Sequence, residues 1–190
     1  SSIISIENIS KKYKKQFALK DVNIEIEKKD IYGLIGKNGA GKSTLLKSLV
    51  GMISPTNGKI SVQGSHNDYT LALSRNNIGF FIDHSMYPYM NAYENLIYRC
   101  KVLGITDAKK EVSRVLDLLK MSGIKKNVKT FSMGMKQRLE IAGALLGYPD
   151  IIILDEPLNG LDPEGIFDLK NLILDINRNY DTTFIISSHI

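Results

Sequence analysis

The sequence predicts an α/β fold, with a parallel sheet flanked by helices, an N-terminal antiparallel β-subdomain and an inserted helical subdomain. An apolar run at residues 31–35, followed by helical spacing at residues 44–50, is typical of a strand that leads into a helix. Residues 1–30 alternate apolar and polar side chains, which indicates antiparallel strands with one face in water. Residues 86–146 lack strand patterns and repeat apolar residues at three- and four-residue spacing, which predicts helices.

The N-terminal region is expected to contain short strands joined by turns. Residues 3–6 and 22–26 carry the alternating pattern, and Pro-Thr-Asn-Gly at 55–58 is a strong turn signal before another strand at 59–62. The strands within residues 1–30 are expected to form the antiparallel β-subdomain.

A glycine-rich segment at residues 36–43 reads Gly-Lys-Asn-Gly-Ala-Gly-Lys-Ser, which matches the phosphate-loop pattern G-x-x-x-x-G-K-[ST]. It follows the apolar run, expected to be a buried strand, and opens the helix, so backbone N–H groups at a helix N-terminus can hold a triphosphate. Lys42 can reach the β- and γ-phosphates, and the Ser43 hydroxyl can ligate Mg²⁺. The alternative is a plain glycine turn between strand and helix. The residues expected to bind the nucleotide here are Gly36, Asn38, Gly39, Ala40, Gly41, Lys42, Ser43 and Thr44.

Two acidic residues follow an all-apolar strand at residues 151–154. A continuous apolar run is typical of a parallel strand that is covered on both faces, and ligands bind at the carboxyl ends of such strands. Asp155 is therefore expected to hold Mg²⁺, through water, and Glu156 to polarise an attacking water. The alternative is that the two acids cap a following helix.

Residues 131–138 read Phe-Ser-Met-Gly-Met-Lys-Gln-Arg and precede a helical pattern that continues to Leu146. Here the sequence resembles the ATP-binding-cassette (ABC) family, whose signature motif reads L-S-G-G-Q. Ser132 and Gly134 match that motif, whereas Phe131, Met133 and Met135 depart from it. The resemblance implies that Ser132 and Gly134 contact the γ-phosphate of ATP bound by a second copy of the chain, in an ATP-dependent head-to-tail dimer. Without the resemblance, a serine helix cap beside a glycine would explain the same residues.

Further family motifs follow in order. Residues 157–162 resemble the D-loop, which in the family crosses to the partner subunit and which makes Asp162 a candidate nucleotide contact. His189, after the apolar strand at 183–187, occupies the position of the switch histidine that contacts the γ-phosphate. Tyr13 lies where the family places an aromatic ring on the adenine. A surface histidine and a half-buried strand tyrosine are the structural alternatives.

A finer resemblance concerns Asp83, which follows Ile78-Gly-Phe-Phe-Ile82. An acidic residue there, followed by Tyr87-Pro-Tyr-Met-Asn-Ala-Tyr-Glu-Asn-Leu96, is similar to the subfamily that exports bacitracin and lantibiotics. Members of that subfamily usually carry glutamate, so the aspartate is a departure. The resemblance implies a role for Asp83 near the γ-phosphate and Mg²⁺. A carboxylate that caps the turn into Tyr87 is the alternative.

The resemblance implies an ATPase subunit that binds ATP and Mg²⁺ and drives export, with an antimicrobial peptide as a candidate cargo, through a separate membrane permease. No apolar run approaches the ~20 residues of a membrane span, so the expected location is cytoplasmic, peripheral on the inner face of the membrane. The alternatives are an ABC-type ATPase that acts on nucleic acid or ribosomes, and a small-molecule kinase. We expect no nucleic-acid partner, because the sequence shows no basic stripe interleaved with aromatic residues and no long coiled coil.

The whole chain, residues 1–190, is expected to be one ABC ATPase domain, with residues 86–146 as the helical subdomain within it. The sequence ends one residue after His189, where family domains continue with further strands, so the domain is expected to be C-terminally truncated. The tyrosine-rich segment 86–90 is expected to belong to the subdomain core. Its place beside Asp83 also matches where the family receives its membrane subunit.

Overall fold

The computed structural model describes residues 2–37, 41–82 and 86–189 and contains two β-sheets. The first is antiparallel, with the order β2-β1-β4, and comprises β1 (Ser2–Tyr13), β2 (Gln16–Glu27) and β4 (Asn57–Val62). The second is parallel, with the order β3-β7-β6-β5, and comprises β3 (Ile31–Ile35), β7 (Thr183–Ser188), β6 (Ile151–Leu154) and β5 (Ile78–Phe81). The predicted α/β fold, with its antiparallel N-terminal sheet, is confirmed.

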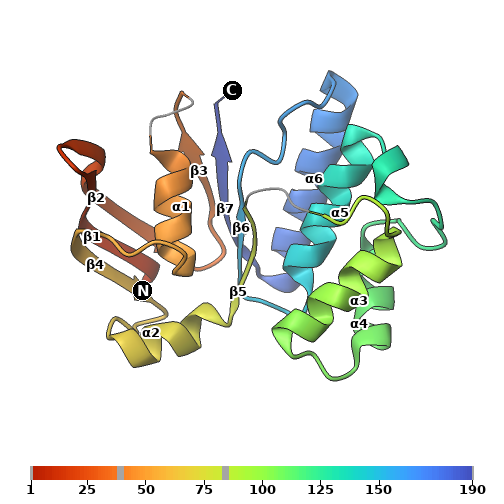
Figure 1. Ribbon diagram of the computed structural model, residues 1–190, viewed down its shortest axis with the longest axis horizontal. Coiled ribbons are helices and arrows are strands. Elements are labelled where there is room, and N and C mark those ends of the chain that lie inside the picture. The colour runs from red at the N-terminus through yellow and green to blue at the C-terminus, as the bar shows by residue number, and fades with distance from the viewer. Residues whose placement is uncertain (1, 38–40, 83–85, 190) are drawn as a thin grey trace.

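The helices are α1 (Lys42–Val50), α2 (Asp68–Arg75), α3 (Ala92–Leu103), α4 (Ala108–Leu118), α5 (Met133–Leu145) and α6 (Pro163–Tyr180), with a 3₁₀ turn at Val128–Thr130. Figure 1 shows α1 between the two sheets, and α3 to α6 on the other side of the parallel sheet. The region 86–146 is helical, as expected. That it forms a separate subdomain stays a prediction.

Strand β6 has both faces covered, which explains its unbroken apolar sequence. Ile151 and Ile153 pack into a cluster with α1 and the antiparallel sheet, whereas Ile152 and Leu154 pack into a second cluster with the helices α3 to α6. All four side chains are buried. Because successive strand residues point to opposite faces, a strand between two apolar layers needs apolar residues at every position.

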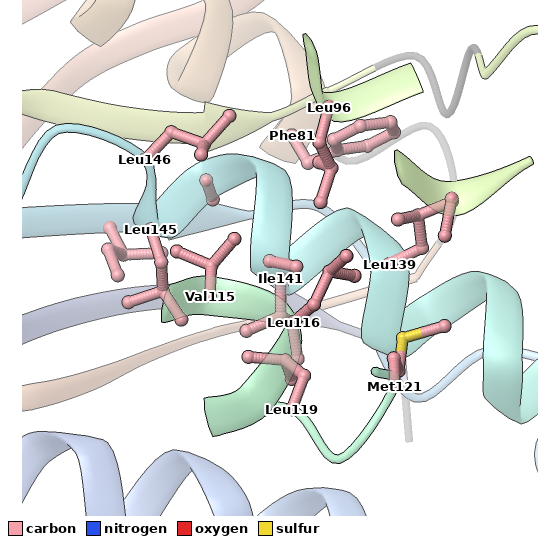
Figure 2. Close-up of a cluster of buried hydrophobic side chains, with 14 of the residues drawn as sticks. Phe81, Leu96, Val115, Leu116, Leu119, Met121, Leu139, Ile141, Leu145 and Leu146 are labelled. Carbon is pink, nitrogen blue, oxygen red and sulfur yellow. The ribbon is translucent and has the colours of Figure 1, made fainter. Parts of the chain in front are cut away.

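The second cluster joins the helical region to the sheet. Figure 2 shows part of it, with side chains of α5 such as Leu139 and Ile141 beside Val115 and Leu116 of α4. Helix α5 also lies directly on β5, because a Cβ atom added at Gly79 would be only 1.8 Å from the carbonyl oxygen of Ala144. Glycine is therefore required at that position for the helix to reach the sheet.

Strand β3 differs from the prediction of a buried strand. Ile31 and Ile35 are 39% and 72% exposed, while Tyr32 and Leu34 lie partly buried against the core. Within the described part of the chain, β3 pairs only with β7 and so lies at the edge of the sheet. An edge strand with one covered face buries alternate residues, which an all-apolar sequence does not reveal.

The tyrosine-rich segment also differs from its prediction. Met86 packs against the helical cluster as expected, but Tyr87 and Tyr89 are 48% and 73% exposed. The ring of Tyr87 meets that of Tyr98 on α3 edge-on, with centroids 5.1 Å apart. Two tyrosines of this segment are therefore surface residues rather than core. No helix in the described ranges is long and apolar enough to cross a membrane.

Candidate nucleotide-binding site

The carboxyl ends of three parallel strands bring the predicted site residues together. Ile35 of β3 is paired with Ser188 of β7, and Leu154 of β6 with Ile186 of β7. The N–H of Gly36 donates to the carbonyl of Ser188 over 3.1 Å, which ties the start of the glycine-rich segment to the end of β7. Segments that are far apart in sequence therefore meet at the carboxyl ends of the parallel strands, where open α/β sheets bind ligands.

Lys42 is the first residue of α1, and its side chain is only 8% exposed. The ammonium donates to the carbonyl oxygens of Gly36 and, over 3.0 Å, Ser188, and it forms an ion pair with Glu156 Oε1 at 3.0 Å. These three acceptors hold the positive charge of Lys42 at the carboxyl ends of the strands. A buried ammonium held in this way can turn toward a phosphate, which is a stronger acceptor.

The N-terminus of α1, which is the positive end of the helix dipole, lies at the carboxyl ends of the same strands. Gly41 precedes the helix with a φ of +90°, no side chain of the described residues caps this end and the first turn contains no acidic residue. A Cβ atom at Gly41 would lie 2.4 Å from the carbonyl oxygen of Ala18 and 2.9 Å from Leu19 Cδ2, so the loop packs tightly on β2. Free N–H groups at a helix N-terminus favour an anion.

Asp155 is held by two hydroxyl groups. Ser43 Oγ donates to Asp155 Oδ2 over 3.1 Å, and Ser187 Oγ donates to Asp155 Oδ1 over 2.7 Å. Hydroxyl and carboxylate oxygens are the hard donors that Mg²⁺ prefers. The described residues contain no cluster of three or more His, Cys, Asp or Glu side chains that could hold a metal. The donor set therefore fits a cation that takes its remaining ligands from phosphate and water.

The Glu156 carboxylate lies between two nitrogen atoms and is 17% exposed. Lys42 Nζ contacts Oε1, and His189 Nδ1 lies 2.8 Å from Oε2, where an N–H on that nitrogen can donate. Partial burial raises the pKa of Glu156, but the hydrogen bonds and charges of Lys42 and His189 lower it by more, so the net pKa is below that of an ordinary glutamate. Glu156 is therefore ionised at neutral pH.

Tyr13 lies at the tip of the β1–β2 hairpin and is 51% exposed. Lys11 Nζ lies 5.2 Å from its ring centroid, while Lys12 and Lys20 lie 5.1 and 5.5 Å from that of Phe17. The hairpin thus combines lysines with exposed aromatic rings. Because the next residues of β2 contact Gly41, this group lies on the strand that flanks the phosphate-binding segment.

Ser132 and Gly134 lie at the start of α5, on the other side of the sheet from α1. Ser132 caps the helix, with Oγ accepting the N–H of Met135 over 3.2 Å. Gly160 packs against Met133, so this helix start adjoins the 157–162 loop. Among the described residues, no hydrogen bond or ion pair joins Ser132 or Gly134 to Lys42 or Glu156. The structure therefore does not bring the two halves of the predicted site together within one chain.

Asp162 caps α6, because its Oδ1 accepts the N–H of Gly165 over 2.8 Å. Thr44 lies in the first turn of α1, where its carbonyl accepts the Ser48 hydroxyl over 2.9 Å. The remaining predicted site residues, which are Asn38, Gly39, Ala40 and Asp83, lie outside the described residues.

Sequence reasoning missed Ser187 as a site residue. Its side chain is fully buried and contacts both acidic residues, since its Oγ also accepts the N–H of Glu156 over 2.8 Å. The available signal was a serine directly after three apolar strand residues, Phe184 to Ile186, because a hydroxyl at a buried position requires partners.

A family model described as ABC transporter matches residues 19–159, which include the glycine-rich segment, the signature segment and both acids. The chain belongs to the ABC transporter family. Among curated relatives of this ABC protein, YcbN of Bacillus subtilis, an uncharacterized ABC transporter ATP-binding protein, is 42% identical over 190 residues. The match covers 99% of this chain and 62% of YcbN.

Two further ABC relatives have names that state a cargo. The bacitracin transport ATP-binding protein BcrA of Bacillus licheniformis is 41% identical, covering 100% of this chain and 62% of BcrA. The lantibiotic transport ATP-binding protein SrtF of Streptococcus pyogenes is also 41% identical, covering 99% of this chain and 80% of SrtF. This chain thus spans less than two thirds of the length of YcbN and BcrA.

Solved ABC structures have the same fold. CbiO1 from Clostridium perfringens, part of the ABC transporter complex cbiONQ, aligns with a TM-score of 0.86 and 26% identity, covering 100% of this chain and 79% of that one. The ATP-binding cassette MJ0796, in a dimeric post-hydrolysis state bound to ADP and Pi, aligns with a TM-score of 0.85 and 25% identity. The alignment covers 98% of this chain and 88% of the MJ0796 chain. The predicted family and fold are confirmed.

Proposed function

We propose that this chain is the ATP-binding and ATP-hydrolysing part of an ABC transporter that drives export through a separate membrane permease. The observation that carries the proposal is a group of five residues at the carboxyl ends of the parallel strands, which are Lys42, Ser43, Asp155, Glu156 and His189. These side chains supply a phosphate ligand, a metal site and a base, and hydrogen bonds connect them. Such a combination suits phosphoryl transfer to water.

Each side chain has a defined task in the proposed reaction. Lys42 and the N-terminus of α1 bind the β- and γ-phosphates. Ser43 and Asp155 would hold Mg²⁺, which would supply positive charge to offset that of the phosphate oxygens. Glu156 accepts a proton from the attacking water, and His189 contacts the γ-phosphate while it also holds Glu156.

The Lys42–Glu156 ion pair connects phosphate binding to the strength of the base. The ammonium of Lys42 is one of the groups that lower the pKa of Glu156. When Lys42 turns to a phosphate, this contribution weakens and the phosphate adds negative charge nearby, so the pKa of Glu156 rises. A higher pKa makes Glu156 a better acceptor for the proton of the attacking water.

The separation of Ser132 and Gly134 from Lys42 supports a second copy of the chain as the partner. A capped helix start with an exposed serine and a glycine is suited to a phosphate held by another subunit. The dimeric state in the name of the MJ0796 structure is consistent with this arrangement. The 157–162 loop, which packs beside the signature segment, would lie at the same interface.

A groove lined by the end of β5 and by α3 is the candidate docking surface for the permease. It has a volume of about 300 Å³ and is lined by Phe81, Tyr87, Tyr98, Arg99 and Val102, among others. Tyr98 and Val102 are 45% and 68% exposed. An apolar groove with exposed aromatic residues on a helix suits a helical segment of a membrane protein that emerges at the inner face. The proposed location is therefore peripheral, on the cytoplasmic face of the membrane.

The proposed cargo class is an antimicrobial peptide of the bacitracin or lantibiotic type. Its support is the similarity over the whole chain to BcrA and SrtF, whose names state transport of bacitracin and of a lantibiotic. The cargo pocket of such a system lies in the permease. Comparing growth with bacitracin or a lantibiotic, with and without the gene and its neighbouring permease gene, tests this assignment.

The test of the ATPase proposal separates binding from chemistry in the full-length protein. Lys42→Ala removes charged hydrogen bonds worth about 1.5–3 kcal/mol, so ATP affinity should fall about tenfold or more. Glu156→Gln should leave affinity nearly unchanged and lower turnover by at least about 10²-fold, the scale of a lost general base. Calorimetry and phosphate release are measured on the same samples. An equal loss of binding in both variants would show that Glu156 is structural, and wild-type protein that binds no ATP would refute the proposed function.

A further inference from the structure

The Ser187 hydroxyl links the two acids of the proposed site. Ser187 is in β7, next to β6, and extending the pairing of Leu154 with Ile186 by one residue brings Ser187 beside Asp155. Its Oγ donates to Asp155 Oδ1 over 2.7 Å and accepts the backbone N–H of Glu156 over 2.8 Å. A hydroxyl has one donor and two acceptor positions, so a single serine can make both bonds.

The first bond fixes the direction of the Asp155 carboxylate. Ser43 approaches Oδ2 and Ser187 approaches Oδ1, so the carboxylate is held from both sides. Ser43 is the side chain proposed to bind Mg²⁺, and it must then change partner. Ser187 is fully buried and comes from the sheet rather than the phosphate-binding segment. It can therefore keep Asp155 in place when Ser43 turns to the metal.

The second bond supports a strained backbone at Glu156. Glu156 has a φ of +51°, a conformation that side chains other than glycine rarely adopt. This conformation directs the carboxylate toward Lys42 and His189. Strained residues persist where the surrounding structure holds them, and here the bond between the Glu156 N–H and Ser187 provides that support.

We propose that Ser187 is a positioning residue that aligns Asp155 for Mg²⁺ and Glu156 for the attacking water. The inference rests on the proposed ATPase function. Ser187 is fully buried, so we expect it not to touch the nucleotide and its loss to spare nucleotide binding without metal. It should weaken the contribution of Mg²⁺ to binding and the rate of hydrolysis, because removing the partner of a metal ligand typically lowers metal affinity or activity about 10–100-fold.

The test compares Ser187→Ala with Thr183→Val in the full-length protein. Thr183 is also fully buried in β7, and its Oγ accepts the N–H of Lys29 over 2.8 Å at the other end of the strand. Both variants lose one buried hydroxyl, so both should lose stability to urea. The Thr183 hydroxyl contacts neither acid, which makes Thr183→Val the matched control. Ser187→Cys, similar in shape but weaker in hydrogen bonding, is measured beside them and carries the comparison if Ser187→Ala does not fold.

Calorimetry measures the affinity for a non-hydrolysable ATP analogue in EDTA and in Mg²⁺, and phosphate release gives kcat and KM. We expect Ser187→Ala to bind the analogue in EDTA with the affinity of wild type. The increase in affinity that Mg²⁺ gives should be about tenfold or more smaller, and kcat should fall by a similar factor. Ser187→Cys should lie between Ser187→Ala and wild type, and Thr183→Val should retain both the Mg²⁺-dependent increase in affinity and kcat. If the Ser187 variants keep the Mg²⁺ gain and kcat of Thr183→Val, the inference is wrong. If wild type binds no nucleotide in either condition, the ATPase proposal fails instead.

Discussion

At the scale of single residues, Gly41 joins the phosphate-binding segment to the antiparallel sheet. Its positive φ and its contact with the carbonyl of Ala18 leave no room for a side chain. The contact determines where α1 begins, and hence where Lys42 and Ser43 lie. A methyl group here would have to move the backbone of β2 or the start of the helix.

We therefore expect Gly41→Ala to reduce both stability and ATP affinity. Gly104→Ala is the matched control, because Gly104 also has a positive φ, +75°, but no atom of the described part of the chain lies within 4 Å of the added Cβ. The control should lose only the backbone preference, about 1 kcal/mol, and keep ATP affinity. Urea unfolding and ATP titration of both variants check this. Equal losses of stability, with ATP affinity unchanged in both, would contradict a tight packing role for Gly41.

At the scale of elements, an ion pair attaches α4 to the end of α5. Glu111 accepts two hydrogen bonds from Arg114, at 2.7 and 2.9 Å, and one from the N–H of Gly147 at 2.5 Å. Arg114 also donates to the Leu145 carbonyl over 3.1 Å and lies 3.7 Å from the ring centroid of Tyr148. The pair thus joins α4 to the C-terminal end of α5. Strand β6 follows, and the two acids of the site come directly after it.

The hydrogen bonds from Arg114, chiefly, and from Gly147 lower the pKa of Glu111, while burial raises it by less. The ionised form therefore stabilises the fold above the unfolded pKa of about 4.3, and this contribution is lost as the pH falls through the lowered folded pKa. Glu111→Gln should cost about 1–2 kcal/mol at pH 7, as charged hydrogen bonds become neutral ones.

The difference in unfolding free energy between Glu111→Gln and wild type should shrink as the pH is lowered into the acid range. Urea unfolding at pH 7 and at steps below 5 measures it. Glu7→Gln is the control, because Glu7 is exposed on β1, where the loss of one charge costs little stability. A difference for Glu111→Gln that stays constant with pH would mean that the charge of Glu111 does not contribute.

At the scale of the whole molecule, the proposed function requires two copies of the chain to complete each site. Gly134 has room for a side chain, since among the described residues an added Cβ would meet only Leu161 Cδ2, at 4.0 Å. Gly134→Asp should therefore fold, while its carboxylate repels the γ-phosphate of the partner's ATP. Lys42→Ala disables the other half of the site.

Mixing these two variants tests the head-to-tail arrangement. Each is expected to be inactive alone, but a mixed dimer pairs the intact Lys42 of one chain with the intact Gly134 of the other. Random mixing of equal amounts should then restore up to about a quarter of the wild-type sites. Phosphate release reports the activity, and light scattering of Glu156→Gln with and without ATP reports the dimer. A mixture no more active than its parts, although the chains exchange, would show that each chain uses its own signature segment.

The limits of sequence reasoning are seen at particular residues. The phosphate-loop pattern, the acids after β6 and the strand before His189 were predictable because each depends on neighbours in sequence, and the structure places Lys42, Asp155, Glu156 and His189 together. Their catalytic roles stay predictions. The exposure of β3 and of Tyr87 and Tyr89 was not predictable, because apolar and aromatic residues have the same local pattern at an edge and in a core.

The sequence by itself determined the family, the α/β class and the types of side chain at the site, since glycine spacing, strand patterning and motif order are local properties. Tertiary structure alone decided which acceptors hold Lys42, that Gly41 lies against β2, and that Ser187 joins Asp155 to Glu156. These contacts span from 6 to 146 residues of chain, and most of them depend on strand order and register. A hydrogen bond forms only where folding brings donor and acceptor within about 3 Å, and no local pattern encodes that distance.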